Sequence, residues 1–132
     1  MKVQYRNRQD NSVPMNQTIL SGRDQLARLL DARRKSAAFI AELSADSGFH
    51  LMIGIGDSVG FAQYSRTDGG LPYLVATPEQ RRVQSRYVDF LINNTPTPIP
   101  GHYVLSFDEV KKIALYFSET GERDNAFRWE SI

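Results

Sequence analysis

The chain has 132 residues, 41% of them hydrophobic and 11% aromatic, which is enough for one globular core and too little for two. Sixteen basic and fifteen acidic residues leave a formal charge of +1, so no general field attracts nucleic acid or an anionic membrane. The absence of cysteine excludes disulfides, thiol catalysis and cysteine metal sites.

Hydropathy along the chain favours a cytoplasmic protein. The first ten residues are too charged for a secretory signal, and no apolar run is long enough to span a bilayer. We therefore expect a single domain over residues 1–132 that contacts neither nucleic acid nor a membrane directly.

The N-terminal third predicts a strand and a helix. Residues 2–6 alternate like a short strand, and a polar loop follows over 7–16. Ser-Gly-Arg-Asp at 21–24 has the capping-box pattern in its Asp form and predicts a helix start. The positions at helical spacing are Leu26, Leu29, Leu30 and Arg33. The basic cluster at 33–35 suits the negative end of the helix dipole, and residues 37–43 either extend the helix or form a strand.

The centre of the predicted sheet lies between residues 49 and 75. Alternating apolar residues over 49–55 predict a strand, and turn chemistry follows at 56–58. The expected pairs across this turn are Ile55 with Gly60, Ile53 with Ala62, and Leu51 with Tyr64. A second turn at 67–70 predicts a third strand. Its expected pairs are Tyr73 with Tyr64 and Val75 with Ala62.

The second face of this meander is a candidate protein-binding patch unless residues 77–100 cover it. Its expected members are His50, Met52, Phe61, Gln63 and Leu74.

The C-terminal half predicts two strands and a second helix. Residues 87–92 alternate like a fourth strand, whereas the three prolines of 93–100 predict a stiff, extended loop that cannot be a central strand. Ser106-Phe-Asp-Glu109 is a full capping box, and Gly121 ends the helix. The apolar stripe of this helix is Val110, Ile113, Ala114 and Phe117. Residues 126–130 predict a closing strand with Phe127 and Trp129 on one face.

These elements predict an α+β fold. An antiparallel sheet of five to six strands, with the meander at its centre, would carry two main helices packed on it.

A glycine motif points to an enzyme, but without the required context. Gly-Asp-Ser-Val-Gly at 56–60 matches the nucleophile elbow, with Asp89 and His102 downstream in the order of a hydrolase triad. The elbow needs a helix after Ser58, whereas residues 59–64 alternate like a strand, so we favour a hairpin turn. The same glycines miss the spacing of a dinucleotide fingerprint, and the histidines have no metal-binding partner motif. We expect no catalytic residue, cofactor or metal.

Two blocks of the sequence suggest a family. The order of aliphatic strand, Gly turn, Gln-Tyr strand, Asp-Gly turn and Pro-Tyr strand in LMIGIGDSVGFAQYSRTDGGLPYLV resembles the first-numbered Imm family of immunity proteins from bacterial polymorphic toxin systems. The ending VLSFDEVKKIALYFSETGERDNAFRWE is more closely similar to the family's capped helix, Thr-Gly-x-Arg turn and final Trp strand. Its positions here are Phe117, Thr120, Gly121, Arg123 and Trp129. Proline commonly follows the turn arginine in the family, where this chain has Asp124.

The resemblance, over about residues 20–132, implies an α+β inhibitor that binds a co-encoded toxin, most often a nucleic-acid deaminase, with a nuclease as the alternative. Such a toxin should carry a basic cleft, so acidic loops would steer association. The expected partner-binding residues are Asp57, Asp68, Glu79 and Asp89, with Tyr87 as an aromatic anchor. Two other hypotheses stay open: a small serine hydrolase using Ser58, and a generic interaction module using Met52, Phe61 and Leu74.

Overall fold

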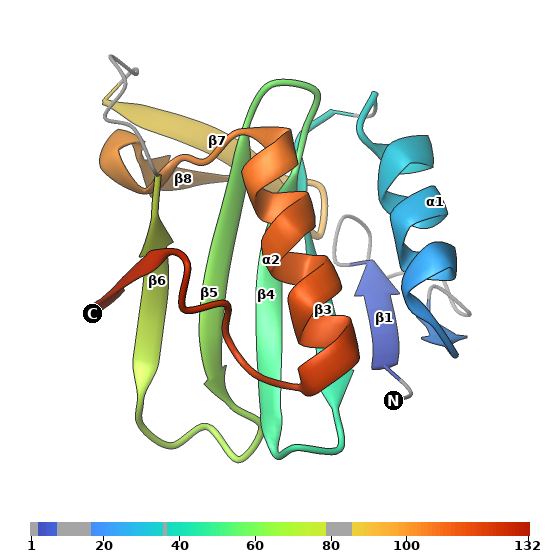
Figure 1. Ribbon diagram of the computed structural model, residues 1–132. Helices are drawn as coiled ribbons and strands as arrows, with labels where there is room; N and C mark the ends of the chain where they lie inside the picture. The colour runs from blue at the N-terminus through green and yellow to red at the C-terminus, as the bar shows by residue number, and fades with distance from the viewer. Residues whose placement is uncertain (1–2, 8–16, 36, 79–85) are drawn as a thin grey trace.

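A computed structural model describes residues 3–7, 17–35, 37–78 and 86–132 (Figure 1). The strands are β1 (Val3–Asn7), β2 (Gln17–Leu20), β3 (Phe39–Ala45), β4 (Phe49–Ile55), β5 (Gly60–Arg66), β6 (Tyr73–Thr77), β7 (Tyr87–Ile92), β8 (Thr95–Pro100) and β9 (Arg128–Ser131). The helices are α1 (Arg23–Arg33) and α2 (Phe107–Thr120), with a short 3-10 turn, η1 (Gly101–Tyr103), before α2.

The strands form one sheet in the order β2-β1-β3-β4-β5-β6-β9, and β7 and β8 branch from it. The branch begins where β7 pairs in parallel with β3 at Phe39 and Leu91, while β7 is the one partner of β8 among the described strands. The expected α+β fold, with a central meander and two helices, is confirmed. The described residues supply nine strands rather than five or six, because β2 and β8 were not expected as strands and the residues of β3 had been left open between helix and strand.

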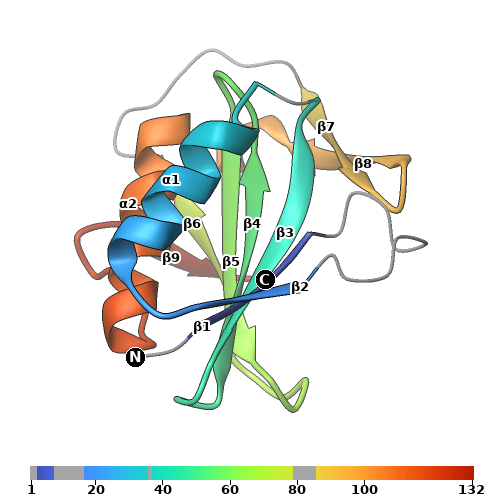
Figure 2. The same cartoon turned by 90° about the vertical axis from the view of Figure 1, so that its right-hand side faces the viewer.

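The sheet separates two layers of cover. Figure 2 shows both helices on one face and the β7–β8 hairpin on the other. The larger core cluster lies beneath the helices and includes Leu26, Leu51, Ile53, Tyr64, Ile113 and Phe117. A smaller cluster lies beneath the hairpin and consists of the buried residues Ile40, Phe61, Val75 and Phe90. Each face of the central strands is therefore buried against a different part of the chain.

The helices are fixed by their caps and by each other. The hydroxyl of Ser106 accepts the Glu109 amide at 3.1 Å and the Glu109 carboxylate accepts the Ser106 amide at 2.9 Å, which confirms the capping box of α2. Gly121 ends α2 with a positive φ of 71°. Ion pairs of 2.8 Å join the two helices near both ends, and they link Arg23 with Glu119 and Lys111 with Asp31.

The expected start of α1 is wrong in its detail. The N-cap is Gly22 and it makes no side-chain cap bond. The Gln25 side chain instead accepts a hydrogen bond from the amide of Ser21 at 3.0 Å. In the expected capping box Asp24 would accept from this amide, so the acceptor lies one residue further along the helix. Residues 37–43, for which helix and strand both stayed open, lie mostly in β3 at the centre of the sheet.

The register of the meander is confirmed in its first half and wrong in its second. Ile55, Ile53 and Leu51 pair with Gly60, Ala62 and Tyr64 as expected. Tyr64, however, pairs with Leu74 rather than Tyr73, because the β5–β6 connection extends through residues 67–72 and shifts β6 by one position. A shift of one residue exchanges the two faces of a strand. Val75 therefore lies on the hairpin side, and Leu74 packs against the helix-side core.

Residues 93–100, which were expected to form a loop, form the turn and the second strand of a hairpin with β7. Asn93 and Asn94 have positive φ values of 49° and 59°, as a two-residue type I′ turn requires, and β8 returns along β7. The prolines are compatible with this because β8 pairs on one side only, so it is an edge strand.

Candidate partner-binding surface

Asp57 lies in the turn between β4 and β5 and is paired within the chain. The Arg34 guanidinium donates to the Asp57 carboxylate at 3.1 Å and to its backbone carbonyl at 2.8 Å. The same guanidinium lies 4.1 Å from the centroid of the Phe107 ring. Arg34 thus joins the end of α1, the turn and the start of α2, a more specific role than the dipole interaction expected for the basic cluster. The carboxylate of Asp57 thus already has an ion-pair partner within the chain.

Asp68 lies at the other end of β5 and is paired too. Its carboxylate accepts the Gly70 amide and the Arg66 guanidinium, each at 2.8 Å. The amide hydrogen bond first, and then the guanidinium, lower the pKa of Asp68, so this side chain is ionised throughout the physiological range. Because β5 separates Asp68 from the β4–β5 turn, these two predicted acids face opposite ends of the molecule.

Tyr87 and Asp89 are the two predicted residues that the structure brings together. They are two positions apart on β7, so both point to the same side of the hairpin. Both side chains are exposed, and the Tyr87 side chain retains 51% of its accessible surface. The Arg86 guanidinium lies 5.7 Å from the centroid of the Tyr87 ring. The remaining predicted residue, Glu79, lies outside the described residues.

Three prolines that were not expected in the site share this side of the hairpin. The cross-strand pairs are Tyr87 with Pro100, Asp89 with Pro98, and Leu91 with Pro96. The signal for this face was the alternation Thr-Pro-Thr-Pro-Ile-Pro, whose period of two is that of a strand. Val88, Phe90 and Ile92 point the other way, into the smaller core cluster. The hairpin therefore buries one face and presents the other, except at Leu91, which is half-buried against the larger core cluster.

The second face of the meander, a candidate patch unless residues 77–100 cover it, is covered in large part by the β7–β8 hairpin. Phe61 is buried under the hairpin with 4% of its surface exposed, and Leu74 lies on the helix side of the sheet. Met52 is half-buried beside the smaller cluster. The imidazole of His50 and the hydroxyl of Ser65, which are cross-strand partners, lie 2.9 Å apart. The apolar interaction surface of Met52, Phe61 and Leu74 is thus wrong.

The hydrolase hypothesis is wrong as well. Ser58 lies in a hairpin turn followed by β5, a strand, whereas a nucleophile elbow requires a helix after the serine. Asp89 lies on β7 and His102 in η1, where its ring centroid is 4.1 Å from that of Tyr103 and the two rings are tilted by 45°.

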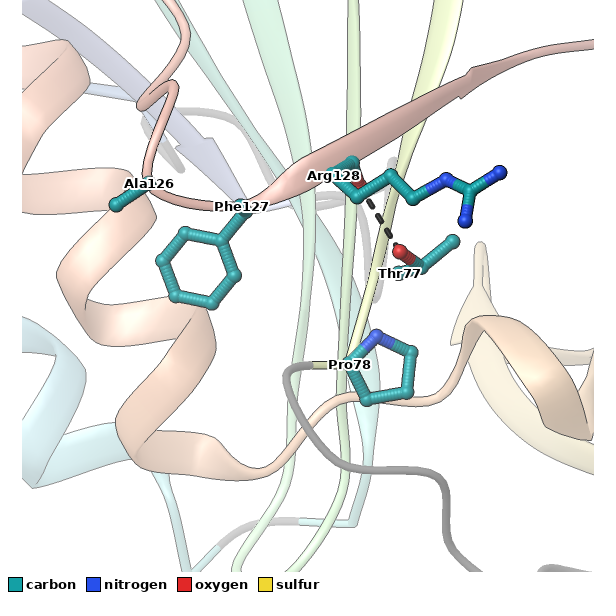
Figure 3. A pocket seen from close by; sticks show the side chains of 5 residues that line it. All are labelled: Thr77, Pro78, Ala126, Phe127 and Arg128. Carbon is teal, nitrogen blue, oxygen red and sulfur yellow. Dashed lines mark hydrogen bonds between the residues drawn. The ribbon is translucent and has the colours of Figure 1, made fainter.

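A hollow of about 480 Å³ lies where β6 ends and β9 begins (Figure 3). Its lining residues are Thr77, Pro78, Ala126, Phe127 and Arg128. The Thr77 hydroxyl donates to the Arg128 carbonyl at 3.1 Å, so the one hydroxyl in the lining is already engaged. Among the described residues, the lining carries a cation and no carboxylate, and it offers no group for acid or base catalysis.

Within the described ranges, no group of three histidine or acidic side chains is arranged to hold a metal ion. No helix among the described elements combines the length and the apolarity needed to cross a membrane.

Comparison with protein-family models identifies a related family. The family model described as Immunity protein Imm1 matches residues 15–131, which contain both helices and every described strand except β1. No curated protein matches the chain.

Proposed function

This chain belongs to the Imm1 family of immunity proteins, and we propose that it neutralises a cognate secreted toxin by covering the active site of that toxin. Immunity proteins bind cognate toxins, and this family is not a family of enzymes. The observation that carries the proposal is the extent of the family match, which spans nearly the whole fold.

The proposed mechanism is steric. A preformed surface of the immunity protein would bury on the order of 1,600 Å² in total with the toxin and exclude its substrate. A few aromatic anchors would supply most of the affinity, with Tyr87 as the leading candidate because half of its side chain is exposed.

We propose that the toxin acts on nucleic acid and is a deaminase, with a nuclease as the alternative. An enzyme of either class needs a basic cleft for its substrate, and acidic groups on the inhibitor would steer association with that cleft. The candidate acids remain Asp57, Asp68, Glu79 and Asp89. The pairing of Asp57 and Asp68 with arginines leaves Asp89 as the strongest of the described three.

Co-expression with the toxin encoded beside the gene tests this function. The tagged immunity protein should co-purify with the toxin and should restore growth of cells that produce it. Reversal of the four acids to lysine should reduce protection, and sequencing of target DNA should separate deamination from strand cleavage. Failure to retain the toxin in any pull-down, with no effect on toxicity, would contradict the proposal.

A further inference from the structure

The outer face of the β7–β8 hairpin is a small, rigid platform. It consists of Tyr87, Asp89, Pro96, Pro98 and Pro100. Pro96 and Pro98 are exposed together with Tyr87 and Asp89, and Pro100 is half-buried. Proline has a fixed φ and loses little side-chain freedom on binding, so a partner that docks here gives up little conformational entropy. The buried Phe90 anchors the platform to the sheet.

Asp89 is the only negative charge on this platform. No ion pair or hydrogen bond involves its side chain within the described parts of the chain, in contrast to Asp57 and Asp68. A free carboxylate bordered by proline and tyrosine is complementary to a cation presented on an apolar surface. Such a carboxylate gains most from a planar guanidinium, which can bind both of its oxygens.

Tyr87 adds a ring that already accepts a guanidinium. The Arg86 guanidinium lies within the range of a cation–π contact with this ring. Tyr87 and Asp89 are separated by two strand positions, which is about 7 Å. An incoming arginine that replaces Arg86 over the ring is therefore within reach of the carboxylate.

The backbone of β8 restricts how a partner can approach. The Gly101 amide donates to the Arg86 carbonyl at 3.0 Å. Because every second residue of an antiparallel strand bonds to its partner strand, the amides of Thr95, Thr97 and Ile99 also point toward β7. The three prolines consequently occupy the outward positions, where they offer no amide donor. A partner strand cannot extend the sheet along this edge. Recognition at the hairpin must use the side chains of its outer face.

We propose that this outer face is the docking surface for the toxin and that it binds an arginine of the toxin between the Tyr87 ring and the Asp89 carboxylate. This inference rests on the proposed function. An arginine in a nucleic-acid cleft normally contacts phosphate, so its capture by Asp89 would also remove a substrate-binding group from the toxin.

Binding of the inactivated toxin to the purified protein, measured by calorimetry at two salt concentrations, tests the inference. Asp89→Asn keeps the shape of the side chain, and it should weaken binding by at least about 20-fold and flatten the salt dependence. Tyr87→Ala should weaken binding by more than about tenfold, whereas Tyr87→Phe, which keeps the ring, should stay within about threefold of wild type. Arg86→Ala should bind at least as tightly as wild type because it removes the competing guanidinium.

Asp31→Asn is the matched control, since Asp31 is an acid of α1 that is already paired with Lys111 on the helix side of the sheet, and it should bind like wild type. Unchanged melting temperatures would show that each variant is folded. Wild-type binding that neither Asp89→Asn nor Tyr87→Ala weakens would overturn this inference and leave the proposed function standing. No binding by the wild-type protein would overturn both.

Discussion

The contact between Gly54 and Phe90 gives the sharpest test of how the hairpin is attached. A Cβ atom built on Gly54 of β4 would lie 2.6 Å from Cε1 of the Phe90 ring and 2.9 Å from Cβ of Phe61. Ordinary contacts begin near 3.4 Å, so the ring would have to retreat by about 0.8 Å. Because Phe90 is fully buried, a displaced ring opens the smaller core cluster that the hairpin covers.

Gly54→Ala should therefore destabilise the protein by about 1–3 kcal/mol, the usual cost of overpacking. Phe90→Ala should cost about 3–5 kcal/mol because it removes a buried ring. In the double variant the ring is absent and only the contact with Phe61 remains, so Gly54→Ala should cost at least about 1 kcal/mol less there. Urea unfolding of the four proteins, at constant m-value, measures this coupling.

Additive effects, within about 0.5 kcal/mol, would refute the reasoning, because they would mean that Phe90 does not rest on Gly54. Gly22→Ala provides the control. Apart from its two chain neighbours, no described residue has an atom within 4 Å of a Cβ built at Gly22, and its φ of −165° is open to any residue, so only a loss below about 1 kcal/mol at the N-cap is expected.

Three further predictions concern the helices and the first strand. Ser106→Ala should lower the free energy of unfolding by about 1 kcal/mol, measured in urea, with rescue by threonine. Arg34→Ala should lower the free energy of unfolding by about 1–2 kcal/mol in the same assay, because it removes the partly exposed ion pair with Asp57 and the cation–π contact with Phe107. Arg34→Lys should retain only part of this stability. Burial raises the pKa of Tyr5 to about 12. The part of the folding stability that depends on a protonated Tyr5 hydroxyl is therefore intact below about pH 10 and is lost as the pH rises toward 12. Tyr5→Phe should reduce this alkaline loss without lowering stability at pH 7, since the hydroxyl has no partner among the described residues.

The parts of the fold that follow from local sequence were predictable. The capping box and apolar stripe of α2 are contained within one segment, and the β4–β5 register follows from a short turn. The β5–β6 register was not predictable because the longer connection allows two pairings of β6 with β5 that differ by one residue. Packing of β6 against the two core clusters selects one of these pairings. β8 was not predicted because its prolines argue against a strand. Proline is tolerated in a strand that has a neighbour on one side only, and the number of neighbours depends on tertiary structure.

In the candidate site, too, the features that are local in sequence were predictable and those that depend on tertiary contacts were not. The sequence predicted a strand over 87–92, and it proposed Asp89 as a steering acid and Tyr87 as an aromatic anchor without placing the two on one exposed face. The sequence did not reveal that Asp57 is paired, because Arg34 is 23 positions away and meets it only when α1 is docked. The platform of prolines was missed for the same reason as β8 itself.

The position of β9 has a consequence for how the protein is made. β9 pairs with β6 across a separation of 51 residues at Thr77 and Arg128, and Trp129 packs against the Tyr64 ring at 6.1 Å. A chain still emerging from the ribosome before β9 therefore lacks one edge of its sheet and part of its aromatic core, and pairing over such distances is slow. The sheet and its aromatic core can therefore be completed only after the last strand has been synthesised.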